Sequence, residues 1–494
     1  MNDRKKTVLL LSLADFDRGY QYHKEMGSGV GFKSVRPVLH HAKPRRIYPI
    51  AELQYAAAIV KEAGYPVIID DDQYRDSVDP EAYKSALKSR CESPCAIFVR
   101  TSLPTLLHDI EQVDMLHTLY PGIPLYIFGP LFSASEFVDF VKQKKLFDGV
   151  ITSEIEAVIL DVIEHKNPDK IPGFYYLKND SYHSGNLPRA LTDMQTLPMP
   201  AYECVDHSKI DRFIVQTSRG CPMACNYCPY YLSQGHKFRA KTSERAFEEI
   251  KYLREEFGAR RIIIHDPIFT LDKKRVIKLC ELLADANLDI EWECETHMAH
   301  LDPSMIELMY KAGLRILAFG VESANEEVLK QANRRFKNWK LIKENIQIAK
   351  KIGVETRAYY ILALPGDTIE GAYATIELAK YLHPDFSKFN LPNPYPGTGL
   401  YNNALAEGWL DREKFENDRD AFYRELGVHG TDEPSMTLNI SDLQAQYLSR
   451  VGNHEVLLQH LDGLKKFPLH SKILAYKTAV HGIGALRQLG LNIG

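Results

Sequence analysis

Short apolar runs alternate with amphipathic helical stretches along most of this chain, and that alternation constrains the fold more than any other feature. The pattern is typical of α/β proteins built on parallel sheets. The runs form two separate series. Because 494 residues exceed what a single core usually organises, we expect two or three domains.

The first series predicts a doubly wound parallel sheet over residues 1–166. Its strand candidates are 7–13, 66–70, 95–100, 124–129 and 148–152. Helical stretches separate them, and the one at 51–64 closes on Gly64, a typical helix stop. Five strands with crossover helices favour the doubly wound arrangement. A long insert at 14–47, with Gly27, Gly29 and Gly31, is predicted to be either functional or disordered.

The second series predicts an open parallel barrel over residues 212–405. Between the series, 167–211 reads as a linker that contains a β-hairpin around Asn179 and Asp180. The barrel strands are predicted at 213–220, 261–266, 289–296, 315–323, 354–366 and 386–397. Six βα units with large loops place the chemistry at the carboxyl ends of the strands. Residues 406–494 are predicted to be helical, with Ser441 as a helix N-cap.

Composition excludes several classes of protein. The net charge is −4 and charged residues make up 26% of the chain, which does not match the basic footprint of a nucleic-acid binder. No apolar run approaches the roughly 18 residues that span a bilayer. We therefore expect a cytoplasmic protein, in which clustered cysteines more often bind metal or perform redox chemistry than form disulfides.

Three of the eight cysteines, Cys221, Cys225 and Cys228, lie within "CPMACNYC" at 221–228. This spacing allows three thiolates to hold three corners of a cubane iron–sulfur cluster. The fourth iron then lacks a protein ligand and can bind a substrate or cofactor. A zinc site is the alternative, but structural zinc prefers four ligands, and only His236 lies nearby.

The spacing C-x₃-C-x-aromatic-C, with Tyr227 as the aromatic residue, resembles the signature of radical S-adenosylmethionine (SAM) enzymes. The resemblance extends over about 211–400 through several motifs in the expected order. It implies a 4Fe–4S cluster whose open iron is chelated by SAM. Electron transfer would then cleave SAM to a 5′-deoxyadenosyl radical that removes hydrogen from an unactivated carbon. It also implies a reductant of the flavodoxin or ferredoxin type.

The resemblance implies SAM contacts at the ends of the barrel strands. Asp266, Pro267 and Phe269 in "HDPIFTLD" resemble the region that contacts the SAM amino group. Glu322 in "FGVES" resembles the acid that binds the ribose, although it could instead cap the helix that begins near 325. Gly366 in "LALPGDT" resembles a turn whose backbone lies near the adenine.

Two further positions are candidates for the SAM carboxylate. His297 stands where relatives often carry arginine, and it would be a weaker, pH-sensitive partner. Arg357, inside the fifth barrel strand, is the other candidate. A charged residue in such a strand should point into a polar pocket or pair with an acid.

The order of the two series resembles the radical SAM group that carries an N-terminal flavodoxin-like, cobalamin-binding domain. That resemblance implies transfer of a methyl group from methylcobalamin, which a second SAM restores. Two turns depart from the group's glycine-rich pattern, namely Gly129-Pro130 and Ser153-Glu154-Ile155-Glu156. The second departure predicts crowding of the cofactor tail. The insert histidines His23, His40 and His41 could supply an axial ligand, or could simply be solvated.

These observations leave three functions open. The leading prediction is cobalamin-dependent C-methylation of a small molecule of natural-product or sugar type. The first alternative is a cobalamin-free radical dehydration, rearrangement or cyclisation. A set of alternating acids, Glu291, Glu293 and Glu295, lies on one predicted strand and so shares one face. If that face points inward, it suits a polar or cationic substrate. If it points outward, the glutamates are ordinary solvated charges. The second alternative is a non-catalytic iron–sulfur or zinc module.

Overall fold

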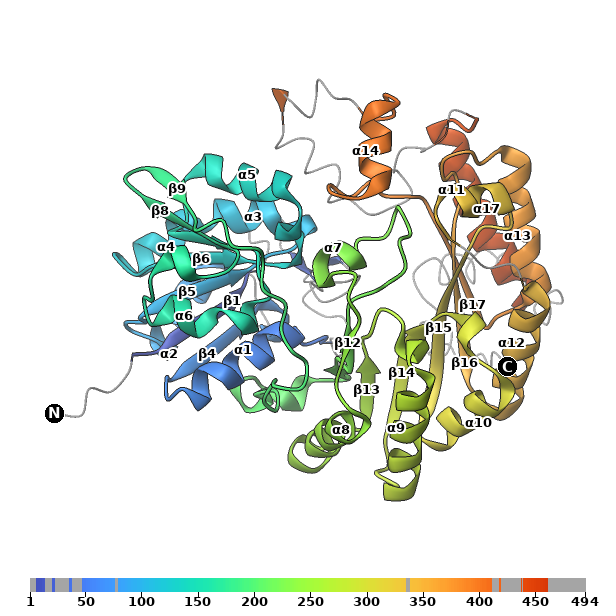
Figure 1. The fold of residues 1–494 in the computed structure, drawn as a ribbon, viewed down its shortest axis with the longest axis horizontal. Coiled ribbons are helices and arrows are strands. Elements are labelled where there is room, and N and C mark those ends of the chain that lie inside the picture. The colour runs from blue at the N-terminus through green and yellow to red at the C-terminus, as the bar shows by residue number, and fades with distance from the viewer. Residues whose placement is uncertain are drawn as a thin grey trace. The chain divides into compact units, whose positions relative to one another are not determined.

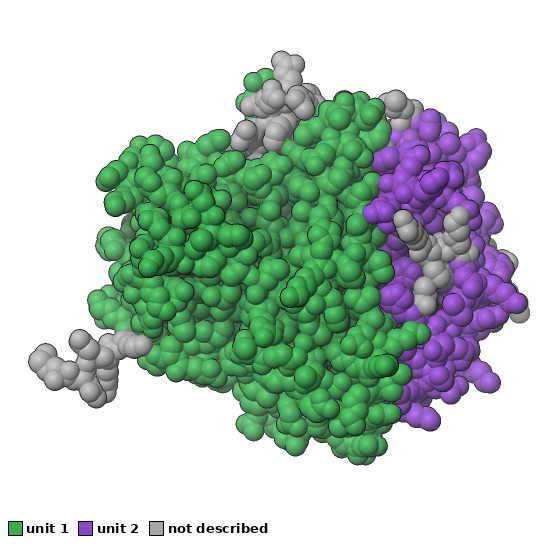
Figure 2. Space-filling model, viewed as in Figure 1, with its two compact units in different colours: residues 1–292, 394–429 green, residues 293–393, 430–494 purple. Residues whose placement is uncertain are grey.

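The computed structural model describes residues 6–13, 20–22, 35–37, 47–75, 79–334, 338–410, 417–418, 437 and 439–460. Within them, two large β-sheets organise the chain (Figure 1). The chain divides into two compact units, residues 1–292 with 394–429 and residues 293–393 with 430–494 (Figure 2). The predicted domain boundaries near 166, 211 and 405 do not coincide with this division, because the first unit joins the N-terminal domain to the start of the predicted barrel.

The first sheet has seven strands in the described part of the chain. Across the sheet they are β4 (Val67–Asp71), β1 (Val8–Ser12), β5 (Ala96–Arg100), β6 (Leu125–Phe128), β7 (Gly149–Ile151), β8 (Phe174–Lys178) and β9 (Ser181–His183). The first five pair in parallel, in the predicted doubly wound order.

The predicted hairpin belongs to this sheet rather than to a linker. Strand β8 pairs antiparallel with β7 and with β9. Asn179 and Asp180 form the turn, and both have positive φ, 50° and 60°, as the commonest two-residue hairpin turns require. The predicted linker therefore begins after β9.

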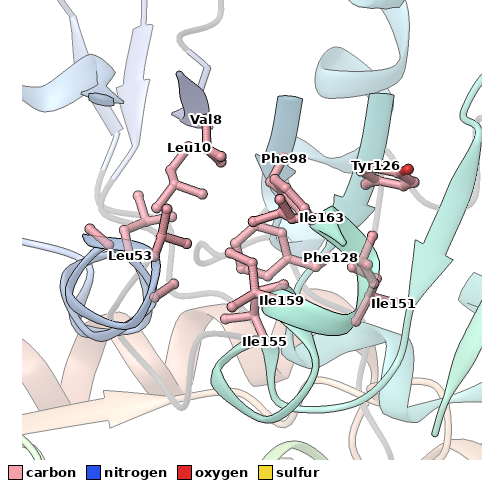
Figure 3. Close-up of a cluster of buried hydrophobic side chains, with 14 of the residues drawn as sticks. Val8, Leu10, Leu53, Phe98, Tyr126, Phe128, Ile151, Ile155, Ile159 and Ile163 are labelled. Carbon is pink, nitrogen blue, oxygen red and sulfur yellow. The ribbon is translucent and has the colours of Figure 1, made fainter. Parts of the chain in front are cut away.

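Apolar side chains on alternate strand positions form the core of the first sheet. Val8 and Leu10 of β1 face the same side as Phe98, Tyr126 and Phe128, as Figure 3 shows. Leu53 of α1 (Ala51–Glu62) and Ile159 of α6 (Ile159–Ile163) pack against them. The remaining helices of this region are α2 (Pro80–Arg90), α3 (Leu106–Glu111), α4 (Val113–Leu119) and α5 (Ser135–Lys144). Within the long insert, β2 (Tyr20–Tyr22) pairs antiparallel with β3 (Val35–Pro37).

The second sheet has the strand order expected for an open barrel of six βα units. Its strands are β10 (Phe213–Val215), β13 (Arg261–Ile264), β14 (Glu291–Thr296), β15 (Leu314–Glu322), β16 (Glu355–Ile361) and β17 (Phe386–Asn390), each beside the next in sequence. Strand β10 is parallel to β13, and β16 is parallel to both β15 and β17. The helices between and after the strands are α8 (Ser243–Phe257), α9 (Lys273–Ala286), α10 (Pro303–Lys311), α11 (Glu326–Gln331), α12 (Trp339–Ile352), α13 (Ile369–Leu382) and α14 (Gly399–Ala406).

The described C-terminal segment is the helix α17 (Asp442–His460). Its predicted N-cap is confirmed, because the Ser441 hydroxyl accepts a hydrogen bond from the amide of Gln444 at 3.3 Å. The Gln444 side chain accepts in return from the Ser441 amide, which completes a capping box. In the part of the chain that the structure describes, no helix is both long and apolar enough to cross a membrane.

Candidate functional site

The three clustered cysteines lie in a loop closed by a short hairpin. Strand β11 (Ser218–Arg219) pairs antiparallel with β12 (Arg239–Ala240), and we call this pair the neck. The cysteine loop, residues 220–238, includes the short helix α7 (Tyr230–Gln234). The Cys221 amide donates to the Gly235 carbonyl at 3.0 Å, so the two ends of the loop stay together.

The three clustered cysteines are shielded from solvent, although they lie in a loop. Cys221 and Cys225 are buried, and Cys228 is half-buried. The Cys228 amide donates to the Cys225 carbonyl at 3.2 Å, which turns the backbone sharply between these two cysteines. By contrast, burial raises the pKa of Cys280 in α9 to about 12, as for an inert core thiol.

The described residues offer no set of three His, Cys, Asp or Glu side chains close enough to hold a single metal ion. A single zinc ion needs such convergence. In a cubane cluster each cysteine ligates a different iron, so its sulfur donors lie farther apart. The cysteine loop carries three cysteines, the number that leaves one iron of a cubane open, whereas structural zinc prefers four ligands.

Asp266, whose contact with SAM stays a prediction, anchors the chain segment that enters the cysteine loop. Its fully buried carboxylate accepts from the Thr217 amide at 2.7 Å, the Thr217 hydroxyl at 2.5 Å and the Ser218 hydroxyl at 2.7 Å. The Arg275 guanidinium lies 3.6 Å away and balances its charge. These bonds occupy most of the acceptor capacity of one carboxylate, which leaves little for a ligand.

The neighbouring predicted residues divide between core and surface. Phe269 is fully buried and packs edge-to-face on Trp292, so it is a core residue. Pro267 and Tyr227 are partly exposed. Tyr231, next to the cluster signature, stacks on His236 with ring centroids 4.8 Å apart. A role for Pro267 and Tyr227 in SAM binding stays a prediction.

In the second unit, Glu322 has a strained backbone and a charged partner. Its φ is 69°, in the left-handed region. Its carboxylate lies 3.5 Å from the guanidinium of Arg334, which also donates to the Gly320 carbonyl at 2.9 Å. The alternative of a helix cap is wrong, because Asn325 itself caps α11 by accepting from two backbone amides.

His297 is buried and stays neutral at ordinary pH. Burial, then the nearby Arg334 and His300, lower the pKa of His297 to about 3. The two imidazole rings stack with centroids 5.3 Å apart. His297 therefore lacks the positive charge, and the sensitivity near neutral pH, that we predicted for a partner of the SAM carboxylate.

Arg357 pairs with acids, as expected for a charged residue in a barrel strand. Its guanidinium lies 2.7 Å from Glu355 and 3.5 Å from Glu293. Glu291 is exposed, whereas Glu293 and Glu295 are half-buried. The intervening side chains Trp292, Cys294 and Thr296 are buried, which confirms that the three glutamates share a face. The pairing leaves Arg357 less available to a SAM carboxylate.

Gly366 has a backbone conformation that favours glycine, with a φ of 80°. An added Cβ would come within 2.5 Å of the amide oxygen at the end of the Gln331 side chain, which can move aside. The turn therefore depends on glycine for its backbone conformation. Contact of this turn with adenine stays a prediction.

The two turns that depart from the cobalamin-binding pattern are filled by protein contacts. A Cβ on Gly129 would lie 2.3 Å from the Thr101 carbonyl oxygen, so a close approach of backbone requires this glycine. The Ser153 hydroxyl donates to the Pro172 carbonyl and accepts from the Ala190 amide, both at 2.7 Å. Ile155 is a core residue with 2% exposure. The side chains expected to crowd the cofactor are thus turned into the protein, and His23, His40 and His41 lie outside the described residues.

The structure reveals several charged pairs that the sequence did not indicate. The guanidiniums of Arg219 and Arg239 pair with Glu154. The Lys241 ammonium lies in a fully buried ion pair with Glu249 at 2.5 Å. In the second unit, Arg334 is the partner of Glu322. Only the position of Arg219, two residues before Cys221, could have drawn attention to any of these residues.

Comparison with known proteins identifies the class of this architecture. The radical SAM superfamily model matches residues 215–379. TsrM, a radical SAM methyltransferase from Kitasatospora setae solved with cobalamin and a 4Fe–4S cluster, superimposes with a TM-score of 0.63 over 82% of this chain and 76% of TsrM, at 14% identity. The cobalamin-dependent radical enzyme OxsB gives a TM-score of 0.61 over 91% of this chain and 61% of OxsB, also at 14% identity. At such identities the likeness is one of fold.

Sequence relatives support the same class. An uncharacterized methyltransferase from Pyrococcus horikoshii is 29% identical over 279 residues, which cover 55% of this chain and 61% of that relative. The anaerobic magnesium-protoporphyrin IX monomethyl ester cyclase of Rubrivivax gelatinosus is 22% identical over 374 residues, covering 72% of this chain and 66% of the cyclase. The chain thus spans somewhat less than two thirds of these relatives. Residues 215–379 are thus similar to the radical SAM superfamily, a class whose members carry a 4Fe–4S cluster and SAM, and the chain has the fold of the cobalamin-dependent radical SAM enzymes.

Proposed function

We propose that this protein is a radical SAM enzyme that removes hydrogen from a small-molecule substrate and, with cobalamin, methylates the resulting carbon radical. The observation that carries the proposal is the closed loop that brings Cys221, Cys225 and Cys228 together on one short segment. The fold shared with cobalamin-dependent enzymes supports the methylation branch. The name of the Pyrococcus horikoshii relative points the same way.

The protein's own residues would hold the cofactors and keep the loop in place. Cys221, Cys225 and Cys228 would ligate three irons of the cluster, which when bound supplies the electron for SAM cleavage. Asp266 fixes the segment that enters the loop through Thr217 and Ser218. In the proposal, Glu322, whose carboxylate is paired with Arg334, binds the ribose of SAM. The turn at Gly366 contacts the adenine. Tyr227 and the backbone at Pro267 contact the methionine part.

Anaerobic reconstitution tests the radical step. Wild-type protein treated with iron and sulfide should bind about four iron per chain, and dithionite with SAM should then release 5′-deoxyadenosine. Cys225→Ser should lose the cluster and that product, because it removes one of only three ligands. Cys95→Ser, a half-buried cysteine outside the loop, is the matched control and should behave as wild type. Zinc-bound, colourless wild-type protein would refute the radical step and favour the binding module.

The methylation branch has its own test. Mixing with hydroxocobalamin followed by desalting should leave cobalt-dependent absorbance with the protein. Methylation also consumes SAM in two ways, so turnover should give S-adenosylhomocysteine and 5′-deoxyadenosine in comparable amounts. Absence of cobalamin binding, with 5′-deoxyadenosine as the sole SAM product, would instead favour cyclisation, rearrangement or dehydration. The similarity to a named cyclase supports keeping that second candidate.

A reductant of the flavodoxin or ferredoxin type is also part of the proposal. Dithionite replaces this protein partner in the assay above. A purified flavodoxin with its reductase should support the same release of 5′-deoxyadenosine if the cluster accepts electrons from such a donor.

A further inference from the structure

The neck of the cysteine loop places two positive charges directly opposite each other. In the antiparallel pairing of β11 with β12, Arg219 is the register partner of Arg239. Like charges at directly opposed positions destabilise a strand pair. The two side chains are only 4% and 11% exposed, so solvent screens their repulsion poorly. A neck of this composition needs buried negative charge nearby.

That negative charge comes from the turn after β7 in the N-terminal domain. The Arg219 guanidinium lies 2.7 Å from Glu156 and 3.2 Å from Glu154. The Arg239 guanidinium lies 2.8 Å from the other oxygen of Glu154. Burial alone would raise the pKa of Glu154, but Arg219 and Arg239 outweigh it and lower the pKa to about 2. Glu154 and Glu156 therefore place two carboxylates within ion-pair distance of the two guanidiniums of the neck.

The same arginines also hold the backbone of the loop. Arg239 donates to the carbonyl of Gln234, at the end of α7, at 2.7 Å. Arg189 supports the same helix end, because its guanidinium donates to the Leu232 carbonyl at 2.7 Å and also to the carbonyl of the next residue. Arg219 lies two residues before Cys221 in the chain. The acidic turn thus binds Arg239, which holds the end of α7, and Arg219, which lies in the strand that leads into Cys221.

We propose that Glu154 and Glu156 are positioning residues for the iron–sulfur cluster, acting through Arg219 and Arg239. The inference rests on the proposed function, because it assumes that the loop holds a cluster. It gives the N-terminal domain a task that needs no cobalamin, namely to neutralise the neck of the cluster loop. Removing one partner of a buried ion pair leaves an uncompensated charge, and here that charge lies beside the first cluster ligand.

The test compares two changes at the fully buried Glu156 side chain. Glu156→Gln keeps the shape and removes the charge, whereas Glu156→Asp keeps the charge and shortens the side chain. Full-length reconstituted variants are challenged with an iron chelator, and the reduced cluster is examined by electron paramagnetic resonance. We expect iron loss from Glu156→Gln to be at least roughly tenfold faster than from wild type, with an altered spectrum, and Glu156→Asp to lie between them. Glu203→Gln removes an exposed ion pair with Lys61 in the same unit, and should stay within about twofold of wild type.

The order of the variants decides the outcome. If Glu156→Asp loses iron as fast as Glu156→Gln, or faster, shape rather than charge governs the loop and the inference is overturned. The inference also fails if all variants match wild type. If Glu156→Gln does not fold, the rate of iron loss from Glu156→Asp is compared with that from wild type, and a faster loss supports the inference. If neither variant folds, the result counts against the inference. A wild-type protein that binds no iron would defeat the proposed function itself, a separate result.

Discussion

At the scale of single residues, the charge of a buried group depends on whether it has a partner of opposite charge. His297 lies in the second unit with a pKa of about 3, because burial and then Arg334 and His300 oppose its protonation. In the unfolded chain a histidine titrates near pH 6.5. As the pH falls below that value, the unfolded chain binds a proton that the folded protein does not. The free energy of unfolding should therefore fall between about pH 6.5 and pH 3.

This linkage can be measured by urea unfolding at pH 7.5 and pH 5. Wild-type protein should lose about 1–2 kcal/mol more stability over this interval than His297→Gln, which has no such group to titrate. His183→Gln, at an exposed histidine, should keep the wild-type pH dependence. Equal pH dependence in all three proteins would show that His297 is accessible to protons in the folded state.

At the scale of elements, the neck depends on a glycine that no other residue can replace. Gly220, between Arg219 and Cys221, has a φ of 84°, and a Cβ there would lie 2.1 Å from the Lys237 carbonyl oxygen. Gly220→Ala should therefore displace one strand of the neck and lower the iron retained after anaerobic reconstitution to less than about half of the wild-type value. Gly122→Ala is the matched control, since its φ is 74° but nothing lies within 4 Å of the added Cβ.

Both variants carry the left-handed backbone cost of roughly 1–2 kcal/mol, so comparison of their iron content isolates the clash. The midpoint temperature of thermal unfolding should fall in both variants. The two decreases should be similar if the neck relaxes locally. Full iron retention in Gly220→Ala would mean that the neck does not control the cysteine loop.

The sequence predicted the elements of both sheets but not the pairings that depend on tertiary structure. The apolar run at 7–13 located β1 to within a residue or two, because a strand covered on both faces is almost continuously apolar. The cysteine spacing identified the loop, because the ligands are local in sequence. The opposition of Arg219 and Arg239 was not predictable, since it depends on the register of two very short strands. The pairing of β8 with β7 was missed for the same reason.

At the scale of the whole molecule, the N-terminal domain and the start of the barrel are joined by buried polar contacts rather than by a linker alone. Tyr55 of α1 donates to Glu249 of α8 at 2.5 Å and accepts from Lys241 at 2.8 Å. All three side chains are fully buried. Burial lowers the pKa of Lys241 and raises that of Tyr55. Together with the Glu154–Arg219 pair, these contacts make separate unfolding of the two parts costly.

Native-state hydrogen exchange tests this coupling. In wild-type protein, the amides of β1 and β10 should exchange through a common opening with the same free energy, because opening either part exposes unpaired buried charge. Tyr55→Phe removes one hydroxyl that serves both charged partners, and should lower the protection of both strands together by about 1–3 kcal/mol. Tyr182→Phe is the control, because it removes a hydroxyl that donates to the Phe147 carbonyl near the first sheet. It should lower the protection of nearby amides, and any change in β1 and β10 should be the same in both strands. If Tyr55→Phe lowered protection in only one of the two strands, the N-terminal domain and the barrel would be independent folding units, and the ionic contacts between them would be a consequence of docking rather than its cause.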